Sequence, residues 1–168
     1  MTTREPSSGG LRFDPIDEAA RQWAGHWEGV AQMHAVTSLM RVQQLVLARL
    51  DALLKPHGLT FARYEALVLL VFSSRGSLPL GKMGERLQVH PTSVTSIVAR
   101  LVASGHVVRR QHPDDGRAVL AEITDAGRAV VEAATADLIA SGFALETMSE
   151  EDLRQLSALL APVRHAAE

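Results

Sequence analysis

Residues 80–105 read LGKMGERLQVHPTSVTSIVARLVASG, and this stretch decides the fold. Leu80, Met83 and Leu87 recur at helical spacing, which predicts a short helix over residues 80–87 with one buried face. Residues 88–90 then make a tight turn. Pro91 suits the first position of a second helix, where a missing N–H costs nothing, and Gly105 marks the end of that helix. Two helices joined by so short a turn are the outline of a helix–turn–helix.

The second helix has an apolar face and a face of short side chains. The apolar face is expected to be buried and consists of Val94, Ile97, Val98, Leu101 and Val102. The opposite side carries Pro91 at its start and then Thr92, Ser93, Thr95, Ser96, Ala99, Arg100 and Ala103. Surface helices usually carry Glu, Lys and Gln, which are better helix formers, whereas hydroxyl side chains let a helix approach DNA bases and phosphates closely. Packing against another helix would favour the same small residues, so this face alone leaves both interpretations open.

A β-hairpin is predicted directly after the second helix. Residues 107–111 and 118–123 are rich in β-branched or apolar side chains and bracket an Asp115-Gly116 pair, which is a strong hairpin signal. Arg109 lies along the hairpin and Arg117 at its tip, where a guanidinium is suited to the minor groove of DNA. The order helix, turn, helix and hairpin predicts a winged helix–turn–helix. Lys82, in the first helix, is placed to contact a phosphate.

The flanking sequence predicts a mostly helical chain. Further helices are expected over residues 14–28, 33–54, 61–72 and 124–141, and a last one begins at Ser149, which with Asp152 forms a capping pattern. These helices have more apolar surface than one small DNA-binding unit can bury, which predicts a homodimer. We therefore expect residues 1–12 to be a disordered lead, residues 13–56 and 125–168 to form a helical dimerisation region, and residues 57–124 to be the DNA-binding domain.

The composition excludes several classes of function. The seven histidines and the carboxylates form no catalytic constellation, no metal-ligand spacing and no glycine-rich phosphate loop, so we expect neither an enzyme nor a metal nor a cofactor. Cysteine is absent, no apolar run approaches the roughly 18 residues of a membrane span, and no signal peptide is recognised, so a cytoplasmic location is expected. The net charge of −2 argues weakly against DNA binding. The predicted DNA-binding domain nevertheless gathers Lys82, Arg86, Arg100, Arg109, Arg110 and Arg117.

The chain resembles the MarR-type transcriptional regulators. The resemblance covers roughly residues 33–165, and the matching stretches are 57–60, 64–67, 80–87, 91–95 leading to 100–101, 105–110, 112–117 and 123–127. It implies a homodimer that binds double-stranded DNA, usually a repressor released by a small ligand, with Arg117 as the arginine at the tip of the wing and Asp115 as its support. Many relatives have Arg where this chain has Ser96. The alternative is a winged helix used only for protein contact, which would predict acidic or apolar residues on the exposed side of the second helix.

A helix that precedes the family's usual first helix, and that carries a tryptophan, is similar to the subgroup that responds to urate or related metabolites. The similarity implies a ligand site that includes Trp23, Arg41 and Glu65. Trp23 and Trp27 are four residues apart, however, and packing of an extra helix in the dimer is the favoured explanation for them. The second helix lacks the arginine usual in that subgroup, so the ligand is not carried over.

Overall fold

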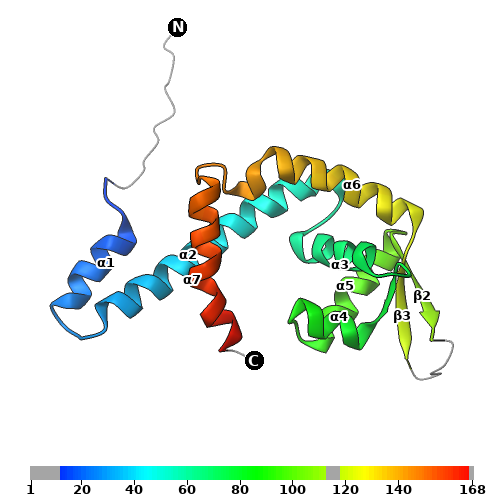
Figure 1. Ribbon diagram of the computed structural model, residues 1–168, viewed down its shortest axis with the longest axis horizontal. Coiled ribbons are helices and arrows are strands. Elements are labelled where there is room, and N and C mark those ends of the chain that lie inside the picture. The colour runs from blue at the N-terminus through cyan, green and yellow to red at the C-terminus, as the bar shows by residue number, and fades with distance from the viewer. Residues whose placement is uncertain (1–11, 113–117, 167–168) are drawn as a thin grey trace, which may run out of the picture. The chain divides into compact units, whose positions relative to one another are not determined.

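The computed structural model describes residues 12–112 and 118–166. They divide into two compact units, one through Leu45 and one from Val46 onward. Figure 1 shows the elements in chain order: α1 (Pro15–Ala24), α2 (Val30–Leu54), η1 (Lys55–His57), α3 (Phe61–Phe72), β1 (Ser77–Pro79), α4 (Leu80–Leu87), α5 (Pro91–Ala103), β2 (Val107–Gln111), β3 (Val119–Ile123), α6 (Asp125–Ala140), η2 (Gly142–Ala144) and α7 (Glu150–His165). None of the helices in this part of the chain is long and apolar enough to cross a membrane.

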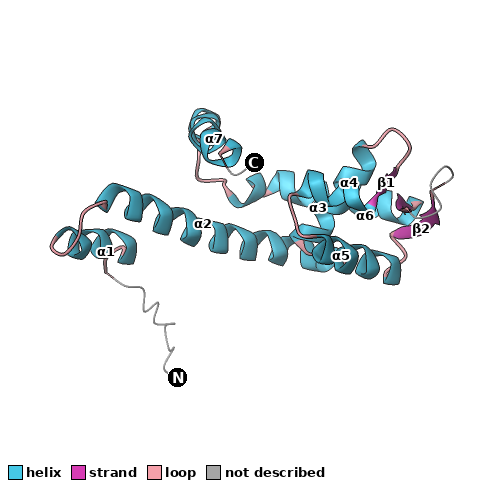
Figure 2. Ribbon diagram, turned by 90° about the horizontal axis from the view of Figure 1, so that it is seen from below, coloured by secondary structure: helices cyan, strands magenta, loops and turns pink. Residues whose placement is uncertain are grey.

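The first unit consists of α1 and the first turns of α2, which lie side by side (Figure 2). Asp14 begins α1 by accepting a hydrogen bond from the N–H of Ile16 at 2.8 Å. The helix ends at Ala24, before Gly25, and not at residue 28 as the sequence predicted. Trp27 therefore lies beyond the helix, although its ring centroid is 4.8 Å from that of Trp23.

The second unit is built around α3, α5 and α6. Its core comprises leucines, valines and a methionine from these helices, α4 and the sheet, among them Leu67, Leu70, Met83, Val98, Leu101 and Leu138, all inaccessible to solvent. Burial of each such side chain contributes about 1.5–3 kcal/mol. Tyr64 also joins α3 to α6, because its hydroxyl lies 2.8 Å from Oγ1 of Thr135. This core fixes the orientation of α5.

The wing is a three-stranded antiparallel sheet in the order β1-β3-β2. The hairpin of β2 and β3 was predicted, with β3 beginning one residue later than expected, at Val119. β1 was not predicted, and it adds the pairs Ser77 with Glu122 and Pro79 with Leu120 along the other side of β3. Since β1 leads directly into α4, the wing and the helix–turn–helix are joined at this edge.

The start of α6 fixes the wing to the helices. Thr124 caps α6, because its hydroxyl oxygen accepts a hydrogen bond from the N–H of Gly127 at 3.0 Å, and the same hydroxyl donates to the carbonyl of Gly105 at 2.8 Å. The helix that Thr124 begins was predicted, and so was the capping box of Ser149 and Asp152 at α7.

A single chain leaves many apolar side chains exposed. Only Leu50 and Leu54 of α2 are buried within the chain. In the first unit the exposed apolar residues of α2 are Val36, Leu39, Met40, Val42 and Leu45. In the second unit, Leu159 and Val163 of α7 are 75% and 61% exposed. Val102 of α5, predicted to be buried, is also exposed.

Candidate nucleic-acid interface

The turn between α4 and α5, and a close contact between the two helices, hold them together. Gln88 ends α4 in the left-handed conformation, with φ 52°, and its N–H donates to the carbonyl of Gly84. A Cβ at Gly84 would lie 3.3 Å from the Cγ2 of Val94, so the two helices are closely packed at this glycine. His90 then begins α5, since its Nδ1 accepts a hydrogen bond from the N–H of Thr92 at 3.3 Å.

The face of α5 that the sequence proposed for DNA is exposed to solvent. Val94, Val98 and Leu101 are buried on one side of the helix. The opposite side exposes all six of the predicted contact residues, namely Pro91, Thr92, Ser93, Thr95, Ser96 and Arg100. This arrangement removes the alternative that the small side chains serve to pack α5 against another helix of the same chain.

The hydroxyl groups of Thr95 and Ser96, both on this face, differ in whether they already form a hydrogen bond within the protein. The Thr95 hydroxyl donates to the carbonyl of Pro91 at 3.1 Å, one turn earlier in the same helix. The Ser96 hydroxyl makes no hydrogen bond with the described residues and is exposed. Ser96 can therefore form a new hydrogen bond with a base or a phosphate without breaking one.

The predicted cationic contacts lie on three different elements. Lys82 of α4 is exposed and pairs with Glu85 at 2.8 Å. An exposed pair of this kind is worth at most about 1 kcal/mol, so a phosphate can replace the carboxylate. Arg109 is exposed on β2 and has no ion partner in the described part of the chain. Asp115 and Arg117, the predicted wing-tip residues, lie outside the described residues.

A recess of about 300 Å³ lies between α3 and α5, beside the exposed face. It is lined by Thr60, Arg63, Ser96, Ile97 and Arg100. Ser96 and Arg100 were predicted to contact DNA, whereas Arg63 was not, because it belongs to α3 and reaches α5 only through the fold. The two guanidinium groups make the recess strongly cationic.

The three residues proposed for a ligand are found in different parts of the chain. Trp23 is half-buried in the first unit and donates its indole N–H to the carbonyl of Glu28 at 2.8 Å. Arg41 is exposed in the same unit. Glu65 lies in the second unit, on the exposed side of α3, where desolvation by neighbouring protein atoms raises its pKa.

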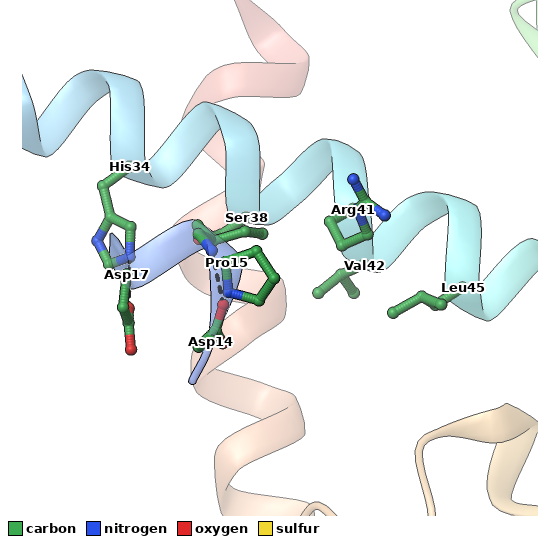
Figure 3. Close-up of a pocket in the computed structure, with 9 residues that line it drawn as sticks. Asp14, Pro15, Asp17, His34, Ser38, Arg41, Val42 and Leu45 are labelled. Carbon is green, nitrogen blue, oxygen red and sulfur yellow. Dashed lines mark hydrogen bonds and ion pairs between the residues drawn. The ribbon is translucent and has the colours of Figure 1, made fainter. Parts of the chain in front are cut away.

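Arg41 lines a pocket of about 490 Å³ within the first unit (Figure 3). The remaining lining comprises polar groups at one end and apolar groups at the other, from Asp14, Pro15, Ile16, Asp17, His34, Ser38, Val42 and Leu45. His34 and Asp17 close the polar end, with Nε2 and Oδ1 3.0 Å apart. Trp23 is not among the lining residues of this pocket.

The described residues contain no group of three or more His, Asp or Glu side chains that could hold a metal ion.

This chain is similar to known proteins both over residues 57–118 and over most of its length. A sequence profile of the MarR family matches residues 57–118. The organic hydroperoxide resistance transcriptional regulator of Bacillus subtilis is 32% identical over 108 residues, which cover 64% of this chain and 71% of that protein. Sco5413, a MarR family transcriptional regulator from Streptomyces coelicolor, is 57% identical, with a TM-score of 0.78 over 83% of this chain and 96% of its own.

Two further solved structures show the fold with other molecules bound. Sco3205 from Streptomyces coelicolor, a MarR family regulator in complex with DNA, has a TM-score of 0.77 at 22% identity and covers 84% of this chain and 94% of its own. CouR from Rhodococcus jostii, bound to p-coumaroyl-CoA, has a TM-score of 0.64 at 27% identity over 74% of this chain and 87% of its own. The winged helix–turn–helix fold predicted from the sequence is confirmed.

Proposed function

This chain belongs to the MarR family of DNA-binding transcriptional regulators, and from this premise we propose that it is a repressor that binds a pseudo-palindromic operator as a homodimer. Membership of a family of regulators also confirms the prediction that the chain is not an enzyme. The observation that carries the proposal is the exposed face of α5, with its short hydroxyl side chains and Arg100.

The DNA-binding part of the proposal assigns a role to each exposed residue. α5 enters the major groove, where Ser93, Thr95 and Ser96 lie near base edges and Arg100 near the backbone. Lys82 and Arg109 bind phosphates, which fix the register of the protein on the duplex. Arg117 enters the flanking minor groove, and Asp115 supports it, as the resemblance to the family implies.

The homodimer is supported by the apolar side chains that a single chain leaves exposed. Residues 13–56 and 125–168 contain most of them, and we propose that these regions bury them against a second copy. Residues 57–124 then form the DNA-binding domain. Two copies of α5 in such a dimer would read successive major grooves about 34–36 Å apart.

Release by a small ligand is the third part of the proposal. Its support is the pocket at Arg41, whose lining combines charged and polar groups with the apolar side chains of Val42 and Leu45, a mixture typical of small-molecule sites. That a protein of the same fold, CouR, is bound to p-coumaroyl-CoA supports ligand binding in general. A ligand that alters the spacing of the two copies of α5 would weaken DNA binding.

Selection of bound fragments from a pool of random duplexes tests the proposal. We expect an inverted repeat with half-site centres about 10–10.5 base pairs apart. The variant Ser96→Glu, which places a carboxylate on the exposed face and leaves the core intact, should enrich nothing. Failure of the wild-type protein to enrich any sequence at low ionic strength would reject sequence-specific DNA binding. A single unrepeated site would reject the dimeric arrangement.

A further inference from the structure

We propose that Arg63 and Arg100 form a binding site for one phosphate of the DNA backbone, so that α3 takes part in positioning α5. The inference rests on the proposed DNA-binding function and adds a contact from outside the helix–turn–helix. Its basis is the recess between α3 and α5, which both arginines line.

The recess has the size and position of a binding site for a small anion. Its volume of about 300 Å³ is at the lower end of the range of ligand pockets. Arg100 lies one helical turn after Ser96 on α5, and Arg63 lies in the first turn of α3. α3 and α5 both contribute buried side chains to the core, so the two guanidinium groups are supported by well-packed elements.

The charges in the recess are uncompensated. Its five lining residues include two arginines and no acid. Among the described residues, neither Arg63 nor Arg100 forms an ion pair, whereas Arg49 contacts the carboxylate of Glu146. Asp51 accepts the N–H of Phe61 in the first turn of α3 at 2.7 Å, and it does not line the recess. Two neighbouring cations without an acid are stabilised by an anion bound between them.

Arg63 is held in place before any ligand binds. Its side chain is partly buried, and its Nε donates to the hydroxyl of Thr60 at 3.2 Å. The terminal amino groups of Arg63 make no hydrogen bond with the described residues and are free to donate to a phosphate. A guanidinium that is already oriented loses less side-chain entropy on binding.

The position of the recess favours the DNA backbone as the source of the phosphate. Ser96 and Arg100 belong both to the recess and to the exposed face of α5. When that face lies in a major groove, the strand at the groove's edge passes the recess. A phosphate held there fixes the rotation of α5 but carries no sequence information.

The test uses the full-length protein and the operator obtained by selection. Arg63→Gln should weaken binding about tenfold, because a charged hydrogen bond is lost, and the loss should be equal for all operator variants. The salt dependence of log K should fall by about 0.9, which corresponds to one phosphate. Arg164→Gln, which removes one exposed charge from α7, is the matched control and should change neither quantity. Thermal unfolding of both variants verifies that they fold.

Neutral methylphosphonate linkages, introduced one at a time into the operator, identify the phosphate. One linkage should weaken the wild-type protein about tenfold and weaken Arg63→Gln by a smaller factor, because only the contact from Arg100 is left to lose in that variant. If every linkage affects both proteins equally and the salt slope is unchanged, the proposal is wrong, although DNA binding itself stands.

If instead inorganic phosphate at constant ionic strength raises the melting temperature of wild type but not of Arg63→Gln, and the salt slope is unchanged, the recess binds a free anion and the proposal is likewise overturned. Failure of wild type to bind any duplex would reject the proposed function instead.

Discussion

Gly127 lies so close to His106 that a Cβ at position 127 would be 2.3 Å from the His106 carbonyl oxygen. The same carbonyl accepts the N–H of Thr124 at 3.0 Å. Thr124 and Gly127, three residues apart, therefore both contact the backbone of His106. Thr124 binds the chain that precedes β2, and Gly127 lets the first turn of α6 approach that chain without a side chain between them.

Gly127→Ala should destabilise the protein, because the added methyl group meets the backbone at His106 and not a flexible side chain. We expect a loss of about 2–3 kcal/mol, and a melting temperature lowered by roughly 5–10 °C. The control is Gly81→Ala in α4, where a Cβ meets nothing within 4 Å. That change should stabilise the helix by about 0.5–1 kcal/mol. Equal melting temperatures for the two variants would contradict the contact.

Arg117→Ala should weaken binding to every operator variant by a similar factor and reduce the salt slope by about one, because a minor-groove guanidinium acts mainly through charge. Fluorescence anisotropy over a range of salt concentrations measures both effects. Unchanged binding would remove the wing tip from the mechanism.

Ser96→Ala should alter base preference more than Thr95→Val does. The Ser96 hydroxyl is available for a base, whereas the Thr95 hydroxyl already donates to Pro91. We expect a change of about 1–3 kcal/mol in discrimination at one operator position for Ser96→Ala. Relative affinities across a set of single-base operator variants provide the measurement. Identical profiles for wild type and both variants would contradict direct reading by this face.

Met40→Glu should convert the dimer to a monomer at micromolar concentrations, because a charge would have to be buried among the apolar side chains of a second copy. Ala62→Glu adds the same charge at an exposed position of α3 and should leave the dimer intact. Sedimentation velocity distinguishes the two states. A dimer that tolerates Met40→Glu would place the interface elsewhere.

Glu65→Gln should make the protein more stable at neutral pH. Desolvation raises the pKa of Glu65, so the folded state favours the protonated carboxyl. The stabilisation that this preference provides is present below the ordinary glutamate pKa of about 4.3, and it is lost as the pH rises through the raised value. In thermal unfolding, the melting temperature of Glu65→Gln should therefore rise relative to that of wild type as the pH increases from about 4 to about 7. If the melting temperatures of Glu65→Gln and wild type differ by the same amount at about pH 4 and at about pH 7, the pKa of Glu65 is not raised in the folded state.

The helix–turn–helix was predictable to the residue because strong local signals mark its ends. Pro91 begins α5, Gly105 follows its end in a positive-φ conformation, and the apolar spacing of α4 matches its bounds at Leu80 and Leu87. The hydroxyl face of α5 was recognised for the same reason, since a helix places those side chains together whatever surrounds it.

The features that were not predicted depend on tertiary contacts. β1 has three residues, one of them Pro79, and shows no alternation that the sequence could reveal. Val102 continues the apolar spacing of α5, yet it lies at the margin of the buried face and is exposed. Arg63 is 33 residues from Ser96 in the chain, so only the packing of α3 on α5 shows that both line one recess.

The brevity of β1 has a consequence for how the protein behaves at high local concentration. An unpaired strand edge is a template for another molecule's strand, and proteins avoid such templates by keeping edges short or interrupting them with proline. β1 does both, because it ends after three residues at Pro79, which has no N–H to donate. A strand of another copy therefore cannot extend the sheet by hydrogen bonding along β1, which disfavours fibrous self-association at this edge.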